Sequence, residues 1–302
     1  MSSVIYPKPL RQGDNIAIVS PAGIVKREYV EHSVDVLMLQ GWNARIGKSA
    51  LGKNGSFSGT TDERVADMRK ALLDPTIRAI ICSRGGYGCV HLLPHLADID
   101  LTTDPKWLVG FSDVTALHAF FQSQGVASIH GSMTKHLVAQ MGKDQCSQML
   151  FDILRGGRPQ YEWESHKYNR QGQTTGRIVG GNLATMQALT GTAYDIISPD
   201  TILFIEDISE PIYKVERMLC QLKLSGILGR LRGLIIGQFT NYQPDANYPD
   251  METMIHNLLA DIDIPTAFNA PIGHIDANYP IIEGATATLN ISQSSTTLTM
   301  GV

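Results

Sequence analysis

The sequence predicts an α/β protein, with a parallel sheet of βαβ units in its N-terminal domain and a mixed sheet with helices in its C-terminal domain. Short apolar runs typical of buried strands, such as Asn15–Val19 and Ala79–Cys82, alternate with stretches of helical periodicity. This alternation indicates parallel βαβ units. Near the end of the chain, residues 285–289 and 296–300 alternate apolar and polar side chains around a serine-rich turn, the pattern of a β-hairpin.

In the N-terminal domain, each strand leads into a helix. Strands are expected at residues 15–19, 41–46, 79–82, 107–109 and 129–131. Helices are expected at residues 27–40, at 114–121, and from a cap at Thr61 or Asp62 through Leu72. The first helix shows the amphipathic pattern most clearly, because Val30, Val34 and Leu37 share one face.

A polar stretch with Gly156-Gly157 and Pro159 follows, and its composition predicts a linker. The expected organisation is therefore an N-terminal domain at 1–155, a linker at 156–175 and a C-terminal domain at 176–302. Within the C-terminal domain, strands are expected at residues 201–205 and 233–237. Helices are expected at 183–189, 213–224 and 251–259.

Composition narrows the function classes. The net charge is −4 and the basic residues are dispersed, which argues against a nucleic-acid partner. We find no signal peptide and no apolar run of membrane-spanning length, so a cytoplasmic protein without a membrane partner is expected. The four cysteines lack paired metal-ligand spacing and are expected to be reduced thiols.

Three loops follow strands of the predicted parallel sheet, at the edge where such sheets bind ligands. They are Ser20–Gly23, Arg84–Gly88 and Gly110–Ser112. The glycine spacing of the second loop fits neither a Walker loop nor a dinucleotide fingerprint. Its bare amides could face an oxyanion, because glycine allows close approach of the backbone. A plain turn with a solvated Arg84 is the alternative.

Ser112 lies where the strand 107–109 turns sharply into a helix. A serine on such a turn is held out beside the first amides of the helix, as a nucleophilic hydroxyl requires. Gly110 keeps the turn uncrowded, and Asp113 suits the first position of the helix. The same pattern also fits an ordinary turn with a capping serine.

A carboxylate and a histidine are candidates for activating this serine. His274 follows Gly273 just after an apolar strand, and Glu206 directly follows five apolar residues. The neighbouring Asp207 is an equal candidate by pattern. Serine, acid and histidine in this order can form a hydrolase triad. Metal-assisted hydrolysis is the competing route, although no His-x-x-x-His or Cys-x-x-Cys set is present. Structural roles are expected for the other helix-associated histidines, which are His32, His91, His95, His118, His136 and His256.

Seven short blocks in order resemble the LD-carboxypeptidases of serine peptidase family S66, from about Gly13 to Gly284. The blocks are Ser20-Pro-Ala-Gly, Arg84-Gly-Gly-Tyr-Gly, Gly110-Phe-Ser-Asp-Val-Thr-Ala-Leu-His, Gly180-Gly-Asn-Leu, Leu203-Phe-Ile-Glu-Asp, Gly237-Gln-Phe and Gly273-His. The resemblance implies an active site between two domains, with Ser112 as nucleophile, Glu206 as acid and His274 as base. It also implies an oxyanion hole formed by the amides of Asp113 and Gly86, with Gly85 as the alternative to Gly86.

The resemblance further implies the reaction and its setting. The expected reaction is release of the terminal D-alanine of murein tetrapeptide during peptidoglycan recycling, in a homodimer that needs no cofactor and no metal. A sister branch resembles immunity peptidases that cleave peptide-nucleotide antibiotics of the microcin type. Members of that branch tend to be longer, and this compact chain favours the recycling enzyme. A non-catalytic sugar- or peptide-binding protein on the same scaffold is the third alternative.

Overall fold

The computed structural model describes residues 4–199 and 201–301 and divides the chain into two compact units. The N-terminal unit runs to residue 158 and includes 279–284; the C-terminal unit comprises 159–278 and the chain from 285 onward. Across the described residues, every helix is too short or too polar to cross a membrane.

The N-terminal unit contains a sheet with the strand order β11-β5-β4-β3-β1-β2. Its strands are β1 (Asn15–Val19), β2 (Asn43–Ile46), β3 (Ile77–Cys82), β4 (Trp107–Gly110), β5 (Ser128–His130) and β11 (Ile281–Glu283). The first five are parallel, and β11 pairs antiparallel with β5. The order 2-1-3-4-5 is a doubly wound order, in which the loops after β1 and β3 flank the ligand crevice.

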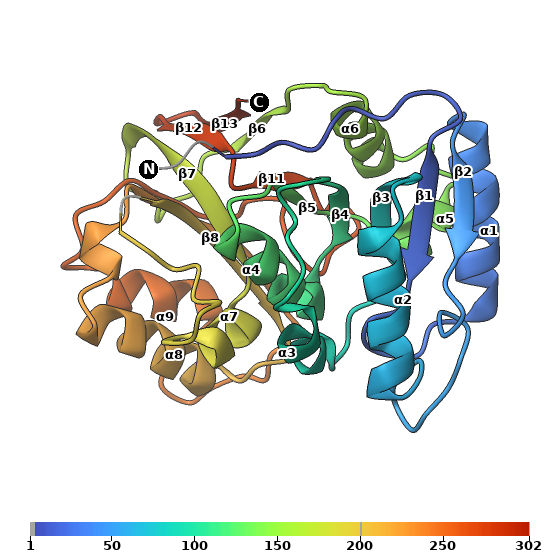
Figure 1. The fold of residues 1–302 in the computed structure, drawn as a ribbon. Helices are drawn as coiled ribbons and strands as arrows, with labels where there is room; N and C mark the ends of the chain where they lie inside the picture. The colour runs from blue at the N-terminus through green and yellow to red at the C-terminus, as the bar shows by residue number, and fades with distance from the viewer. Residues whose placement is uncertain (1–3, 200, 302) are drawn as a thin grey trace. The chain divides into compact units, whose positions relative to one another are not determined.

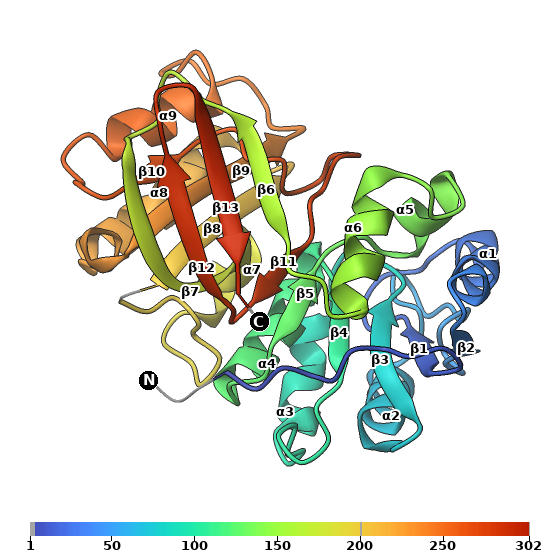
Figure 2. The same cartoon turned by 90° about the horizontal axis from the view of Figure 1, so that it is seen from above.

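Helices cover both faces of this sheet. In Figure 2, α1 and α5 lie on one face, and α2, α3 and α4 on the other. Their bounds are α1 (Arg27–Leu39), α2 (Thr61–Leu73), α3 (Leu93–Leu96), α4 (Thr115–Ser123), α5 (Thr134–Ala139) and α6 (Gln145–Leu154). Short 3-10 helices precede α3 and α4, namely η1 (Cys89–Leu92) and η2 (Ser112–Val114). The strands between the two layers are apolar and almost entirely buried, except at the edge strand β2.

The C-terminal unit contains a mixed sheet with the strand order β10-β9-β8-β7-β12-β13-β6. Its strands are β6 (Gln160–Glu164), β7 (Gly172–Asn182), β8 (Thr201–Ile208), β9 (Gly233–Thr240), β10 (Thr266–Ala267), β12 (Thr286–Ile291) and β13 (Ser295–Met300). The strands β7 to β10 are parallel, whereas β12, β13 and β6 pair antiparallel. Figure 1 shows the helices of this unit grouped together, and the first of them packs against β7 and β8. They are α7 (Leu183–Leu189), α8 (Ile212–Leu224), α9 (Met251–Leu258) and the short η3 (Leu228–Arg230). The predicted α/β class with two sheets is confirmed, but the N-terminal sheet is mixed rather than wholly parallel, because β11 pairs antiparallel with β5.

The division of the chain differs from the expected one in two places. Residues 160–164, inside the expected linker at 156–175, form β6 and pair with β13. The polar composition hides a strand pattern, because Tyr161 is buried while the residues on either side of it are exposed. In addition, residues 279–284 leave the C-terminal stretch and add β11 to the N-terminal sheet.

Candidate active site

Ser112 sits at the carboxyl end of β4, on the turn that the sequence predicts. Its φ angle is +66°, in the left-handed region that L-residues other than glycine rarely occupy. The turn enters η2 at once, and η2 continues into α4. A serine forced into this backbone conformation between a strand and a helix has the geometry of a nucleophile elbow.

Two glycines make room for this elbow. A Cβ atom on Gly110 would lie 2.9 Å from the Val114 side chain, so only glycine fits the end of β4. A Cβ atom on Gly85 would lie 2.9 Å from Ser112 Cβ, 3.0 Å from its Oγ and 3.2 Å from the amide nitrogen of Asp113. The bare backbone of the turn after β3 is therefore in contact with both the serine and the amide that follows it.

That turn, Arg84–Gly88, is anchored along its length. The Gly85 carbonyl accepts a hydrogen bond from the Gly23 amide at 3.1 Å. The exposed Arg84 side chain donates to the Ile24 carbonyl at 2.5 Å, so it is tied to the backbone rather than only solvated. Gly86 is exposed and has a φ angle of +111°. Its conformation and exposure suit an amide that faces a ligand.

The Asp113 side chain has a structural partner. It is buried, and its Oδ2 accepts a hydrogen bond from the Cys89 amide at 2.8 Å. Burial raises the pKa of this carboxyl, while the Cys89 hydrogen bonds and the nearby Arg64 act in the opposite direction. The side chain thus links the residue that follows the turn after β3 to the serine elbow.

In the C-terminal unit, the structure brings Glu206 and His274 together. Glu206 is fully buried near the end of β8, and its Oε2 lies 2.7 Å from His274 Nδ1. The other carboxylate oxygen, Oε1, has no hydrogen-bond partner among the described residues. Because a carboxylate only accepts hydrogen bonds, this contact places the imidazole proton on Nδ1 and the lone pair of the neutral ring on Nε2.

The backbone around this pair is closely packed. The β8–β9 register shifts between Ile205 and Asp207, so Glu206 lies at a bulge. A Cβ atom on Gly237 would lie 2.6 Å from the Ile272 carbonyl oxygen, and one on Gly273 would lie 3.0 Å from Glu206 Cβ. Gly273 also has a φ angle of +128°. Glycine at both positions allows the His274 turn to approach β8 closely enough for the 2.7 Å contact.

Asp207 points into a different set of contacts. Its oxygens accept hydrogen bonds from the Asn182 side chain at 2.8 Å, the Ala184 amide at 2.9 Å and the Ile208 amide at 2.8 Å. Burial raises its pKa to about 6; the neighbouring Glu206 adds to the rise, whereas the backbone donors oppose it. Asp207 braces the start of α7, and Glu206 is the carboxylate in contact with the histidine.

Among the remaining histidines, His118 has a structural role in the core. His118 is fully buried, with Nε2 2.9 Å from the Gly110 carbonyl and Nδ1 2.9 Å from Ser128 Oγ. Burial lowers its pKa to about 4. It is therefore a neutral core histidine that donates to the Gly110 carbonyl. The described parts of the chain contain no group of three or more histidine, cysteine or acidic side chains able to hold a metal ion.

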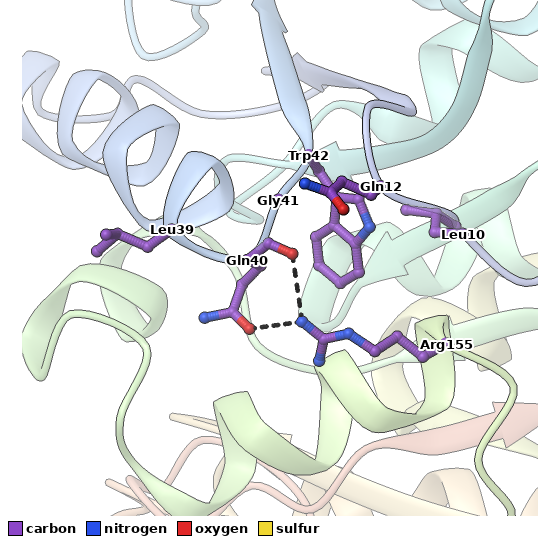
Figure 3. Close-up of a pocket in the computed structure, with 7 residues that line it drawn as sticks. All are labelled: Leu10, Gln12, Leu39, Gln40, Gly41, Trp42 and Arg155. Atoms are coloured by element: carbon purple, nitrogen blue, oxygen red, sulfur yellow. Dashed lines mark hydrogen bonds between the residues drawn. The ribbon is translucent and has the colours of Figure 1, made fainter.

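A separate pocket of about 520 Å³ has Trp42 and Arg155 in its lining (Figure 3). It is formed around Trp42, which precedes β2, whereas Ser112 follows β4. The Arg155 guanidinium lies 4.8 Å from the Trp42 ring and donates to Gln40 Oε1 at 2.8 Å. The Arg155 guanidinium is therefore already occupied by contacts within the protein. The lining of this pocket does not include Ser112.

Sequence reasoning missed two buried charged residues on α2: Arg64 donates to the Gly88 carbonyl in the turn after β3 at 3.0 Å, and Asp67 accepts from the Ser49 amide in the loop after β2 at 2.7 Å. The sequence pattern of α2 singles out Val65, Met68 and Leu72; Met68 and Leu72 are buried, but Val65 is only half-buried, and Arg64 and Asp67 are buried instead. Arg64 lies four residues before the buried Met68, and Asp67 lies four residues before the buried Ala71, which is helical spacing. That phase was the available signal, and it was overlooked because charged side chains are rarely buried.

Relatives and solved structures resemble this chain over nearly its whole length. A Synechocystis protein provisionally named as a carboxypeptidase is 31% identical, covering 95% of this chain and 94% of its own. The murein tetrapeptide carboxypeptidase of Pseudomonas aeruginosa is 29% identical, covering 91% and 92%. The crystal structure of muramoyltetrapeptide carboxypeptidase from Oxalobacter formigenes has a TM-score of 0.84 at 27% identity, covering 95% of this chain and 99% of its own.

A second group of solved structures shares the fold. The microcin C7 self-immunity protein MccF, in complex with aspartyl sulfamoyl adenosine, has a TM-score of 0.83 at 22% identity and covers 98% of both chains.

The sequence model of the LD-carboxypeptidase N-terminal domain matches residues 16–131, which contain the serine elbow. The model of the C-terminal domain matches residues 175–289, which contain the Glu206–His274 pair. The chain therefore belongs to the LD-carboxypeptidases of peptidase family S66.

Proposed function

We propose that the protein is a serine LD-carboxypeptidase that releases the terminal D-alanine of murein tetrapeptide, with Ser112, His274 and Glu206 as its catalytic triad. The observation that carries the proposal is the 2.7 Å contact between Glu206 Oε2 and His274 Nδ1. With the proton on Nδ1, Nε2 is the basic atom of the His274 ring. Ser112, the proposed nucleophile, has the backbone conformation of a nucleophile elbow. The relatives named for murein tetrapeptide support the choice of substrate.

In the first step, His274 Nε2 takes the proton of the Ser112 hydroxyl while Oγ attacks the carbonyl carbon of the L,D amide bond. The carbonyl electrons move onto oxygen and form a tetrahedral oxyanion. Glu206 holds the ring in the required tautomer and stabilises the imidazolium that forms. The imidazolium then returns its proton to the amide nitrogen, the C–N bond breaks, and D-alanine leaves.

The oxyanion is stabilised by backbone amides of the N-terminal unit. We assign the amides of Asp113 and Gly86, with Gly85 as the alternative to Gly86. The close approach of the Gly85 backbone to Ser112 and to the Asp113 amide supports this assignment. Each such donor typically contributes about 3 kcal/mol to transition-state stabilisation.

In the second step, water hydrolyses the acyl-Ser112 ester, and His274 again acts first as base and then as acid. His274 Nε2 deprotonates a water molecule, which attacks the acyl-Ser112 ester, and the proton then passes to Ser112 Oγ as the ester bond breaks. The tripeptide leaves with a new carboxylate. We further propose that the enzyme acts in the cytoplasm in peptidoglycan recycling and works as a homodimer without cofactor or metal, as in the family that it resembles.

Cleavage of a peptide-nucleotide antibiotic is the second candidate, because MccF shares the fold. The test offers murein tetrapeptide and an aminoacyl sulfamoyl adenosine separately to the purified protein and to Ser112→Ala. D-alanine release that is faster than sulfamoyl adenosine release and absent from the variant supports the carboxypeptidase. Faster turnover of the nucleotide substrate supports the second candidate, and undiminished turnover by the variant excludes Ser112 as nucleophile.

A further inference from the structure

Arg64 is a buried cation that contacts the turn Arg84–Gly88, which carries the proposed oxyanion donor Gly86. It lies on the first turn of α2 and is 2% exposed. The hydrogen bonds that the described residues make with it go to uncharged oxygens rather than to a carboxylate. They are Nε to the Gly59 carbonyl at 3.2 Å, Nη1 to the Pro21 carbonyl at 2.6 Å and the Gly88 carbonyl at 3.0 Å, and Nη2 to Thr61 Oγ1 at 3.3 Å.

The two carbonyls that share Nη1 belong to different loops. Pro21 lies in the loop after β1, and Gly88 ends the turn after β3. These are the two loops that flank the crevice of a doubly wound sheet. One guanidinium nitrogen therefore joins them, and the planar fork fixes the direction of each bond, which a lysine could not do. The Phe57 ring, 4.8 Å from the guanidinium carbon, closes the other side.

Further hydrogen bonds anchor the turn, including that of the Arg84 side chain to the Ile24 carbonyl. The next residue, Cys89, donates its amide to Asp113 Oδ2 at 2.8 Å, and Gly85 accepts from Gly23 at 3.1 Å. The turn is held at Gly85 by Gly23, at Gly88 by Arg64 and at Cys89 by Asp113. A Cβ atom on Gly88 would lie 2.8 Å from Arg64 Nη1, so the glycine backbone rests directly on the guanidinium.

We propose that Arg64 is a positioning residue for the oxyanion hole, acting through the Gly88 carbonyl on the amide of Gly86, or of Gly85 as its alternative. This rests on the proposed function, because it assumes that this amide meets a developing oxyanion. A misplacement of about 1 Å in such a group costs about 100-fold in rate. Loss of Arg64 is therefore expected to lower kcat about 10- to 100-fold, with KM nearly unchanged.

The test compares Arg64→Met, Arg64→Lys and Arg69→Met in the full-length protein. Arg69 is a matched control on the same helix, because it ties α2 to the segment after η1 through the His95 carbonyl at 2.7 Å and Asp98 at 2.8 Å. We measure kcat and KM for D-alanine release from murein tetrapeptide, thermal midpoints, and hydrogen–deuterium exchange of residues 83–90.

We expect Arg64→Met to lower kcat and to speed exchange in residues 83–90, Arg64→Lys to fall between Met and wild type in both, and Arg69→Met to change neither. If Arg64→Met does not fold, the lysine variant alone decides, because its single ammonium cannot reproduce the fork. Unchanged kcat and exchange in a folded Arg64 variant, or equal losses in Arg69→Met, would overturn the proposal. A wild-type protein that releases no D-alanine contradicts the proposed function instead, and the exchange data still show whether Arg64 restrains the turn.

Discussion

Gly85→Ala is the substitution whose effect can be worked most directly from the structure. The new methyl carbon would lie 2.9 Å from Ser112 Cβ, whereas carbon atoms pack at about 3.5–4.0 Å. The overlap of roughly 0.6–1 Å must be relieved by moving the backbone of the serine or of the turn, because a Cβ atom is bonded directly to the backbone and cannot rotate away. Gly85 is not in the left-handed region, so alanine itself is tolerated by the backbone.

A displacement of that size at a reacting atom is expected to lower kcat about 100-fold, which corresponds to about 2.7 kcal/mol of barrier. The same methyl would lie 3.2 Å from the Asp113 amide nitrogen, so it also crowds a proposed oxyanion donor. The assay is steady-state release of D-alanine, with circular dichroism to verify folding. Gly229→Ala is the control, because a Cβ atom there meets nothing within 4 Å. A folded Gly85→Ala protein with kcat within twofold of wild type would refute this reasoning.

Three further predictions concern stability. Ser112→Gly is expected to be inactive but about 1 kcal/mol more stable than Ser112→Ala, because only glycine adopts φ of +66° without strain; equal thermal midpoints would contradict this. Burial lowers the pKa of His118 from 6.5 to about 4, so the folded state binds fewer protons than the unfolded state in that range. Stability should fall by about 3 kcal/mol as pH drops from 6.5 to 4, and His118→Gln should lose this dependence in pH-resolved thermal melts. The pKa of Asp207 is raised from 3.8 to about 6, so its effect on stability has the opposite pH dependence to that of His118. The stability that protonated Asp207 contributes is present below pH 4, and about 3 kcal/mol of it is lost as pH rises through 6. Relative to wild type, Asp207→Asn should therefore gain stability between pH 4 and 7, and parallel pH curves would count against the shift.

The local sequence was sufficient to predict the serine elbow. An apolar strand, a glycine and a helical pattern all fall within residues 107–121, and the structure places β4, η2 and α4 there. The same holds for the C-terminal hairpin, whose alternating residues form β12 and β13. Both elements are determined mainly by residues close together in the chain, so the local sequence pattern is sufficient to predict them.

The choice between Glu206 and Asp207 could not be made from local pattern. Both follow the same apolar run, and strand geometry sends adjacent side chains to opposite faces without saying which face the histidine occupies. The Glu206–His274 contact depends on a bulge opposite β9 and on the turn at Gly273, far away in sequence. The resemblance to a family, rather than the pattern, singled out Glu206, and its catalytic role remains a prediction.

Long-range pairing also explains the differences in domain organisation. Residues 279–284 join the N-terminal unit because β11 pairs with β5, about 150 residues earlier in the chain. Composition carries no signal for that pairing. Arg64 is hard to predict as a buried residue for a different reason, because charged side chains are rarely buried even where their helical phase matches the buried face.

The central claim is that Ser112 and His274 act in one catalytic step, and a double-mutant cycle tests it most directly. We would measure kcat/KM on murein tetrapeptide for Ser112→Ala, His274→Ala and the double variant, each verified as folded. Residues that act as a unit show strongly non-additive losses. We expect the double variant to retain about the same residual activity as the slower single variant. Losses that multiply would mean that the two residues act independently, which would contradict the proposed triad.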